Sequence, residues 1–277
     1  MTTASSREHA VAIQADALFE RVVCGIDGTP EGGAAAAQIG RLAPPAAGVS
    51  LCSVWNTGAS VALGWSPPVA RAPEFPQEEI RAAIRAARPL LPDGLAVDTT
   101  IVQGPPGPML LTEAERRRAT LVAVGSHGHR RLAGMLLGSV ATQVLHECPC
   151  SVLIARGASG GERFPRTMMV GVDGSVQSGR ALQVAVGLAA RLGAELEAVV
   201  AMGGGDADVP SIRTAVEAVG GGRVELRVAA DAAVAALAGF RPDLLVLGSR
   251  GLHGLRSLGS VSERVAHEAA GSVLVVR

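Results

Sequence analysis

The chain repeats itself, and this repeat limits the folds open to it more than any other feature. The segment from Gly138 to Arg156 aligns without a gap with the segment from Gly259 to Arg277, and ten of the 19 paired positions are identical. Each segment follows an apolar run and a glycine-rich loop, at 120–138 and 244–259. We therefore predict a tandem duplication of one domain.

Length and composition agree with two domains. A chain of 277 residues fits a two-domain size, and a 48% hydrophobic fraction is ample for two packed cores. Residues 157–162 are rich in glycine and have the composition of a linker. We expect a first domain over 19–156 and a second over 166–277, preceded by a loosely held tail over 1–18.

Charge and residue usage exclude several classes of protein. The formal net charge is zero and only 2% of residues are aromatic, which disfavours a nucleic-acid partner. All 25 basic residues are arginine, which excludes a lysine-containing P-loop and Schiff-base chemistry on lysine. No apolar stretch resembles a signal peptide or reaches transmembrane length, so we expect a cytoplasmic protein with no membrane partner.

The four cysteines, Cys24, Cys52, Cys148 and Cys150, lie in or beside apolar, strand-like runs. Such thiols are usually buried and reduced. Cys148-Pro149-Cys150 has the spacing of half a metal clip, but the sequence holds no second pair to complete a ligand set. We therefore expect no metal site built from protein ligands.

Short apolar runs alternate with helical patterns along the whole chain. Strands are expected at 21–26, 49–54, 96–102, 120–124 and 151–155, and again at 168–172, 195–201, 223–229, 244–247 and 272–276. This alternation predicts an α/β fold with parallel sheets and right-handed crossovers. Ligands of such sheets lie at the carboxyl ends of the strands, where Asp27 and Gly125 would face one crevice. The arginine run 116–118 is expected to be a solvated helix face.

The repeated glycine loop carries the candidate binding chemistry. Gly125 and Gly128 follow a predicted strand, and Gly138 and Ser139 precede a predicted helix. A glycine-rich turn of this kind lets backbone N–H groups converge on an anion, with support from the helix dipole. Plainer interpretations stay open. Ser139 could be an ordinary helix cap, residues 260–263 match a Ser-x-x-Glu capping box, and the aspartates after the first strands could be turn residues.

The spacing of these residues resembles that of a known family. Asp27 at the end of the first strand, followed downstream by Gly-x2-Gly-x9-Gly-Ser, is similar to the ATP-binding signature of universal stress proteins. The resemblance covers the chain from about residue 20, twice over, as in the tandem-domain members. It implies two flavodoxin-like α/β domains, each a doubly wound sheet of five parallel strands. It also implies that a pseudo-two-fold axis relates them through their last strands.

The resemblance further implies a nucleotide site in each domain. Asp27 would bind at or near the adenine, the Val54 backbone would contact the base, and the glycine loop would surround the ribose and phosphates of ATP, with or without Mg²⁺. The residues concerned are Asp27, Val54, Gly125, Gly128, Gly138, Ser139 and Val140, with second-domain counterparts Asp173, Val199, Gly248, Gly251, Gly259, Ser260 and Val261.

These residues favour an ATP-binding regulator that senses nucleotide in stress or growth arrest and acts through an unidentified protein partner. Hydrolysis would be slow at most, because no base is obvious for activating water and no lysine can hold the transferring phosphoryl group. Two alternatives stay open: a scaffold that needs no nucleotide, and an adenine-nucleotide hydrolase that uses His127 or His129. A dehydrogenase is disfavoured, because residues 25–28 lack the Gly-x-Gly-x-x-Gly turn.

The assembly expected from the repeat is an intramolecular pseudo-dimer, and a homodimer of the whole chain stays open. The two nucleotide sites should be unequal. Nine residues separate Gly128 from Gly138, but only seven separate Gly251 from Gly259. The second domain also lacks most of the long loop found at 55–77, which has the length and composition of a cover for a binding site. We predict that the first site dominates.

Overall fold

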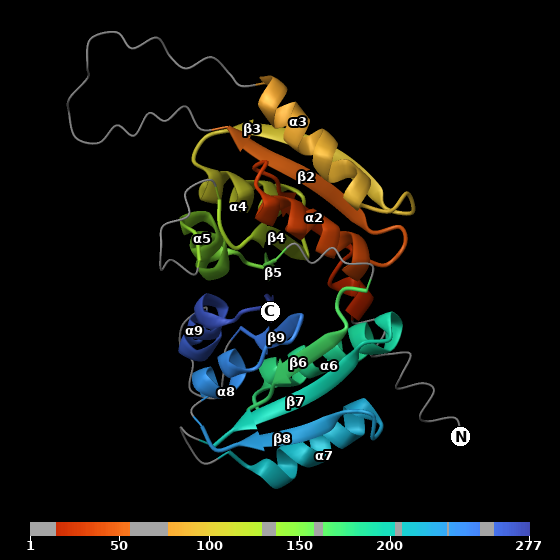
Figure 1. Cartoon of the computed structure of the whole chain (residues 1–277), viewed down its shortest axis with the longest axis vertical. Helices are drawn as coiled ribbons and strands as arrows, with labels where there is room; N and C mark the ends of the chain where they lie inside the picture. The colour runs from red at the N-terminus through yellow and green to blue at the C-terminus, as the bar shows by residue number, and fades with distance from the viewer. Residues whose placement is uncertain are drawn as a thin grey trace, which may run out of the picture.

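One continuous ten-stranded sheet runs through the whole chain, in the order β3-β2-β1-β4-β5-β10-β9-β6-β7-β8. The computed structural model describes residues 15–55, 77–128, 137–157, 163–202, 207–231, 233–249 and 258–277. The N-terminal half contributes β1 (Arg21–Gly25), β2 (Gly48–Trp55), β3 (Ala96–Gln103), β4 (Leu121–Gly125) and β5 (Ser151–Ala155). The C-terminal half contributes β6 (Thr167–Gly171), β7 (Glu195–Ala201), β8 (Glu225–Ala229), β9 (Leu244–Gly248) and β10 (Ser272–Val276). The two halves are stacked along the long axis of the molecule (Figure 1).

Helices cover both faces of this sheet. One face carries α2 (Pro30–Leu42), α3 (Gln77–Ala87), α6 (Val176–Leu192) and α7 (Val209–Gly220), with a short 3-10 turn, η1 (Arg88–Leu90), after α3. The other face carries α4 (Pro106–Arg116), α5 (Ser139–Glu147), α8 (Ala233–Gly239) and α9 (Ser260–Glu268). Each face therefore buries one apolar core that extends through both halves.

The strand order within each half confirms the predicted doubly wound parallel sheets. In the N-terminal half β1 lies between β2 and β4, and both pair with it in parallel. In the C-terminal half β6 lies in the same way between β7 and β9. The chain thus winds outward in opposite directions from β1 and from β6, which opens a crevice at the carboxyl ends of the central strands.

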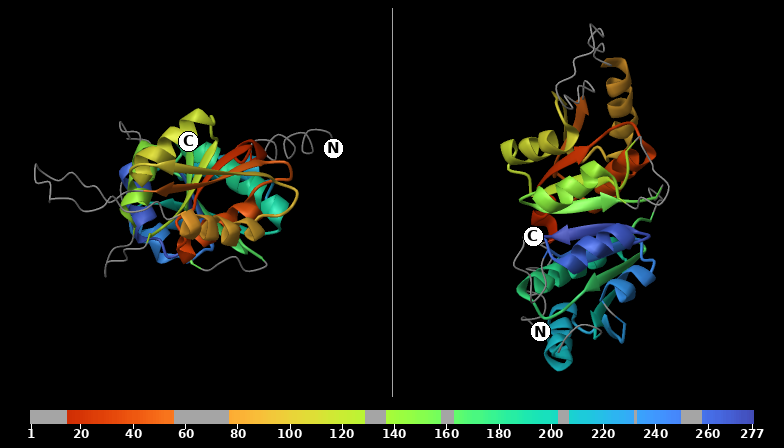
Figure 2. Two further views of the ribbon diagram at one scale, coloured as in Figure 1. Left: turned by 90° about the horizontal axis from the view of Figure 1, so that it is seen from above. Right: turned by 90° about the vertical axis from the view of Figure 1, so that its left-hand side faces the viewer.

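The two halves join through an antiparallel pair, β5 and β10, which lie side by side in Figure 2. Leu153 pairs with Leu274, Ile154 with Val273, and Val152 with Val275. Leu153 and Leu274 are equivalent positions of the repeat, so the pairing is symmetric about them. The predicted pseudo-two-fold relation through the last strands is confirmed.

Residues 15–18, expected to belong to a loosely held tail, are instead anchored. Ala15 is 1% exposed and the neighbouring Phe19 is fully buried. Asp16 Oδ1 lies 3.2 Å from Arg191 Nε on α6, so this segment bridges the two halves. The expectation of a loose tail was wrong here because the apolar spacing of the segment is too short to show as a pattern.

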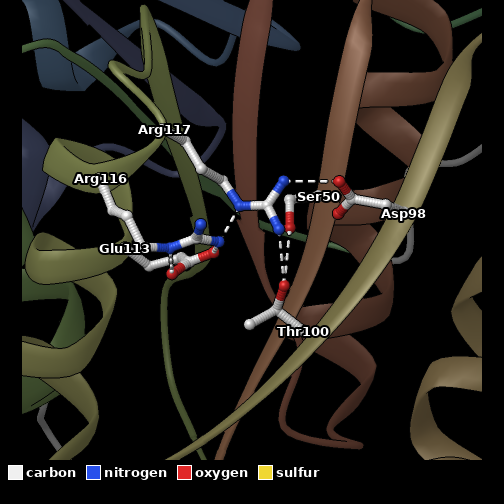
Figure 3. A network of polar contacts seen from close by, with 6 residues as sticks. All are labelled: Ser50, Asp98, Thr100, Glu113, Arg116 and Arg117. Atoms are coloured by element: carbon white, nitrogen blue, oxygen red, sulfur yellow. Dashed lines mark hydrogen bonds and ion pairs between the residues drawn. The ribbon is translucent and has the colours of Figure 1, made fainter.

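The arginine run 116–118 is not a simple solvated face. Arg116 Nε donates to Glu113 Oε2 at 2.8 Å, and Arg117 donates to Glu113, to Asp98 Oδ2 at 2.5 Å and to Thr100 Oγ1 at 2.7 Å (Figure 3). These bonds tie the end of α4 to the edge strand β3. Hydrogen bonds from Arg116 and Arg117 lower the pKa of the buried Glu113 to about 2, against the opposing effect of burial.

Candidate functional site

A pocket opens in the N-terminal half where the central strands end. It is bounded by the residues that follow β1, by the end of β2, by the loop after β4, by the start of α5 and by one side of α3. The expected residues Asp27, Val54, Gly125, Gly128, Gly138, Ser139 and Val140 all line it. The doubly wound topology brings these residues together, because β1, β2 and β4 are neighbours with parallel carboxyl ends.

Asp27 shapes the turn between β1 and α2. Its Oδ1 accepts hydrogen bonds from Thr29 N at 3.0 Å and from Thr29 Oγ1 at 2.6 Å. Thr29 in turn caps α2 by accepting from Gly32 N at 3.1 Å, and Pro30 begins the helix, as the sequence predicts. Asp27 is therefore a turn residue through its Oδ1, as the plainer interpretation of the sequence predicts. Its Oδ2 lies on the side of Gly128, since a Cβ on that glycine would come within 3.2 Å of it.

The start of α5 lines the pocket. Its cap is Gly138, which has extended backbone angles and no side chain to bond the first helical amides. Gly138 N itself donates to Ser126 O at 2.7 Å, which fixes the loop against the end of β4. Ser139 is the first helical residue, so its interpretation as the helix cap was wrong. The first amides of such a helix form an anion-binding position.

The glycine at the end of β4 is required by packing. A Cβ on Gly125 would lie 2.6 Å from the backbone carbon of Glu31 in α2. Its counterpart Gly248, at the end of β9, would place a Cβ 2.7 Å from the backbone carbon of Gln177 in α6. Both glycines thus let a helix lie close to a strand end, and this role needs no ligand.

The pocket reaches the seam between the halves. His267 of α9 lines it together with His146 of α5, and His146 Nε2 lies 3.2 Å from Glu263 Oε1. Burial lowers the pKa of His267, while the nearby Glu263 acts in the opposite direction. Glu263 therefore pairs across the seam, and the capping box expected at 260–263 is not formed, because Gly259 caps α9.

The C-terminal half repeats much of this architecture. Asp173 Oδ1 accepts from Ser175 N at 3.0 Å, as Asp27 does from Thr29. Gly259 N donates to Ser249 O at 2.7 Å, the counterpart of the Gly138 bond. Ser260 and Val261 begin α9, and Val261 is 39% exposed. Gly251 lies outside the described residues.

One second-half position needs correction. Gly25 pairs with Cys52, and its counterpart Gly171 pairs with Val199, so Val199 corresponds to Cys52. The residue equivalent to Val54 is Ala201, two positions further along β7. The sequence could not reveal this shift, because the apolar runs of β2 and β7 are continuous and carry no marker of register.

Several lining residues were missed by sequence reasoning. Ile80 and Ala83 of α3, Leu110 of α4 and Trp55 at the end of β2 all border the pocket. The helical period of 77–87 separates a buried from an exposed face, but it does not distinguish a face on the core from one on a pocket. His267 was missed as a pocket residue because it comes from the other half.

This fold defines a tandem α/β protein with two doubly wound parallel sheets, and its pocket lies at the carboxyl ends of the strands. The model of the universal stress protein family matches residues 18–156 and 222–277. A universal stress protein of Mycolicibacterium smegmatis is 31% identical over 263 residues, covering 79% of this chain and 84% of its own. Another, from Mycobacterium tuberculosis, is 31% identical over 298 residues, covering 92% and 96%. The chain belongs to the universal stress protein family.

Solved structures agree in fold. A universal stress protein from Archaeoglobus fulgidus has a TM-score of 0.68 at 19% identity, covering 93% of this chain and 96% of its own. A second, from Pseudomonas aeruginosa, has a TM-score of 0.65 at 15% identity, covering 95% and 94%. Within the described part of the chain, no helix is long and apolar enough to cross a membrane. The same residues contain no cluster of three or more histidine, cysteine or acidic side chains suited to a metal ion.

Proposed function

We propose that the pocket of the N-terminal half binds ATP, and that the protein is a nucleotide-sensing regulator. The observation that supports this most is the glycine-capped start of α5, which opens into the same pocket as Asp27 and Val54. An anion site at one end and an apolar, strand-end crevice at the other suit a ligand with a phosphate tail and a flat base.

The lining residues fit the two ends of such a ligand. The amides at the start of α5, with Ser139 and Val140, would hold the phosphates, and Gly128 keeps the approach clear. Val54 and the apolar side of α3 would enclose the base, with Asp27 near it. Any Mg²⁺ would be carried mainly by the phosphates, as is usual for this ion.

The lining favours binding over rapid hydrolysis. Among the described residues, His127 lines the pocket beside Gly128, and its Nδ1 lies 3.0 Å from Ser126 Oγ. No lysine exists in the chain to stabilise a transferring phosphoryl group. We therefore propose that the bound state, rather than turnover, is the signal, and that it is transmitted to a protein partner.

Two measurements test this proposal. Mass spectrometry of protein purified without added ligand should detect co-purified adenine nucleotide, and calorimetry on emptied protein should show binding of ATP. Titrations with ADP, AMP and cyclic AMP measure how much the phosphate tail contributes to the binding affinity. Absence of binding to all four would support a scaffold that works without nucleotide, whereas release of phosphate at a rapid steady rate would support a hydrolase.

A further inference from the structure

The turn between α5 and β5 brings two sulfur atoms into contact. Cys148 Sγ lies 3.4 Å from Cys150 Sγ, and both thiols are free. Cys148 is 3% exposed, whereas Cys150 is half-buried, so a small solute can reach the pair from the Cys150 side. Closing this contact to a disulfide bond, of about 2.05 Å, needs a movement of roughly 1.4 Å.

Arg277, from the other half, holds the turn at its C-terminal side. Arg277 Nη1 donates to Cys150 O at 2.9 Å, and Arg277 N donates to Ser151 Oγ at 3.0 Å. These bonds fix the position of Cys150, whose sulfur lies against that of Cys148 without a covalent link.

The equivalent turn of the C-terminal half shows that the architecture does not need these thiols. Ala269 and Gly271 stand where Cys148 and Cys150 stand, and Arg156 Nη1 donates to Gly271 O at 3.3 Å in the corresponding bond. Since the same turn and the same arginine contact form without sulfur, packing does not explain the cysteine pair. A reaction of the two thiols explains their presence better than packing does.

The remaining cysteines are poorly suited to such chemistry. Cys24 and Cys52 are buried in the sheet, and burial raises the pKa of each to about 12. By contrast, the hydrogen bond with Cys150 lowers the pKa of Cys148. The thiolate is the reactive form, so oxidation should be confined to this turn.

We propose that Cys148 and Cys150 form a reversible oxidation site, at which a hydroperoxide converts two thiols into one intramolecular disulfide. The thiolate of one cysteine attacks a peroxide oxygen, the O–O bond breaks, and a sulfenic acid forms as water or an alcohol leaves. The second sulfur attacks the sulfenic sulfur, the S–S bond forms, and hydroxide leaves and takes up the remaining thiol proton. With hydrogen peroxide, two thiols and one peroxide give one disulfide and two waters, and two electrons pass to the peroxide.

The 277-residue chain provides the test. Reduced protein is treated with a small excess of hydrogen peroxide, alkylated under denaturing conditions, cleaved at arginine and measured by mass spectrometry. The peptide 132–156 contains both cysteines of the turn and no other, whereas Cys24 and Cys52 lie in 22–41 and 42–71. We expect peptide 132–156 to lose two hydrogens and all alkylation, with full recovery after dithiothreitol, while the other two peptides stay alkylated.

The chain offers its own control. The variant Cys148→Ala with Cys150→Gly places the residues of the C-terminal half at both sulfur positions and should fold, with no response to peroxide. Any of three results would overturn the proposal. In the first, peptide 132–156 stays fully alkylated after treatment. In the second, this peptide gains oxygen irreversibly and forms no disulfide. In the third, the double variant still loses two thiols.

Discussion

Arg156 and Arg277 are equivalent residues of the repeat, and each binds the last turn of a helix in the other half. Arg277 Nη2 donates to Leu145 O of α5 at 2.7 Å, and Arg156 Nη2 donates to Ala266 O of α9. The last carbonyls of a helix carry partial negative charge, so a guanidinium there is favourable. The seam between the halves is therefore stabilised by a reciprocal pair of cations as well as by apolar strands.

Replacing either arginine by methionine should destabilise the protein. Each substitution removes charge-assisted hydrogen bonds at a helix end, and we expect a loss of about 1–3 kcal/mol in the free energy of unfolding. Arg213→Met, on the exposed surface of α7, is the matched control and should change stability little. Urea unfolding measures all three variants. Wild-type stability in both Arg156→Met and Arg277→Met would contradict the role assigned to the pair.

The Glu113 network should contribute to acid sensitivity. Arg116 and Arg117 hold the pKa of Glu113 at about 2, below the ordinary value of 4.5. A lowered folded-state pKa gives stability that is present above the unfolded value and is lost as the pH falls from about 4.5 through about 2. Glu113→Gln should cost on the order of 2 kcal/mol at neutral pH and flatten the decline in this range.

The control for this prediction lies on the same helix. Glu115 is exposed on α4, and Glu115→Gln should leave the pH profile of unfolding close to that of the wild type. Equal slopes between pH 4.5 and 2 in Glu113→Gln and wild type would show that another carboxylate governs acid unfolding in this range.

A helix cap placed at Gly138 should separate stability from binding. In Gly138→Asp the new carboxylate can bond the first amides of α5, which should raise stability by a few tenths of a kcal/mol. The same carboxylate occupies the proposed phosphate position, so ATP binding should be lost. Gly128→Glu should also abolish binding, because Gly128 lines the pocket and a Cβ there already lies 3.2 Å from Asp27 Oδ2, so the new side chain adds bulk and negative charge at the proposed site. Calorimetry and thermal unfolding together check both variants.

Gly179 provides the control for these substitutions. A side chain there meets nothing within 4 Å on the exposed face of α6, so Gly179→Glu should bind ATP normally. Undiminished ATP affinity in a folded Gly138→Asp variant would remove the start of α5 from the binding site.

The two proposed nucleotide sites should be unequal. Asp27 and Asp173 make the same turn bond, so Asp27→Ala and Asp173→Ala carry a similar structural cost. We expect the first variant to lose most of the binding measured by calorimetry and the second to retain most of it. Equal losses of stoichiometry would mean that the shorter second loop still closes on ATP.

Much of the fold could be predicted because its signals are local. The apolar runs gave every strand to within about two residues, and the Thr29-Pro30 pair gave the start of α2. The apolar runs 151–155 and 272–276 indicate strands that cannot be left as bare edges, and the family resemblance implied that these two strands cover each other. Pairing partners depend on the whole sheet, and a short apolar run carries no information about its neighbour.

What the sequence did not predict depends on contacts between distant residues. The arginine run 116–118 was expected to be solvated, because Asp98 and Thr100, two of the partners of Arg117, lie on β3. In the sequence Glu263 matches a capping box, but in the structure it pairs with His146 across the seam. In each case a residue within a local pattern pairs with a residue that only the tertiary structure brings close.

The seam at Leu153 and Leu274 lies within a single polypeptide, and this affects how the protein can behave. Two identical subunits would associate according to their concentration, and their two sites would have to be the same. Here the pairing is independent of protein concentration, because both partners are covalently joined. Each half is also free to accumulate its own substitutions, as the cysteines at 148 and 150 and the small residues at 269 and 271 illustrate. Because the two halves are joined in one chain, their sequences, and with them their chemistry, can differ.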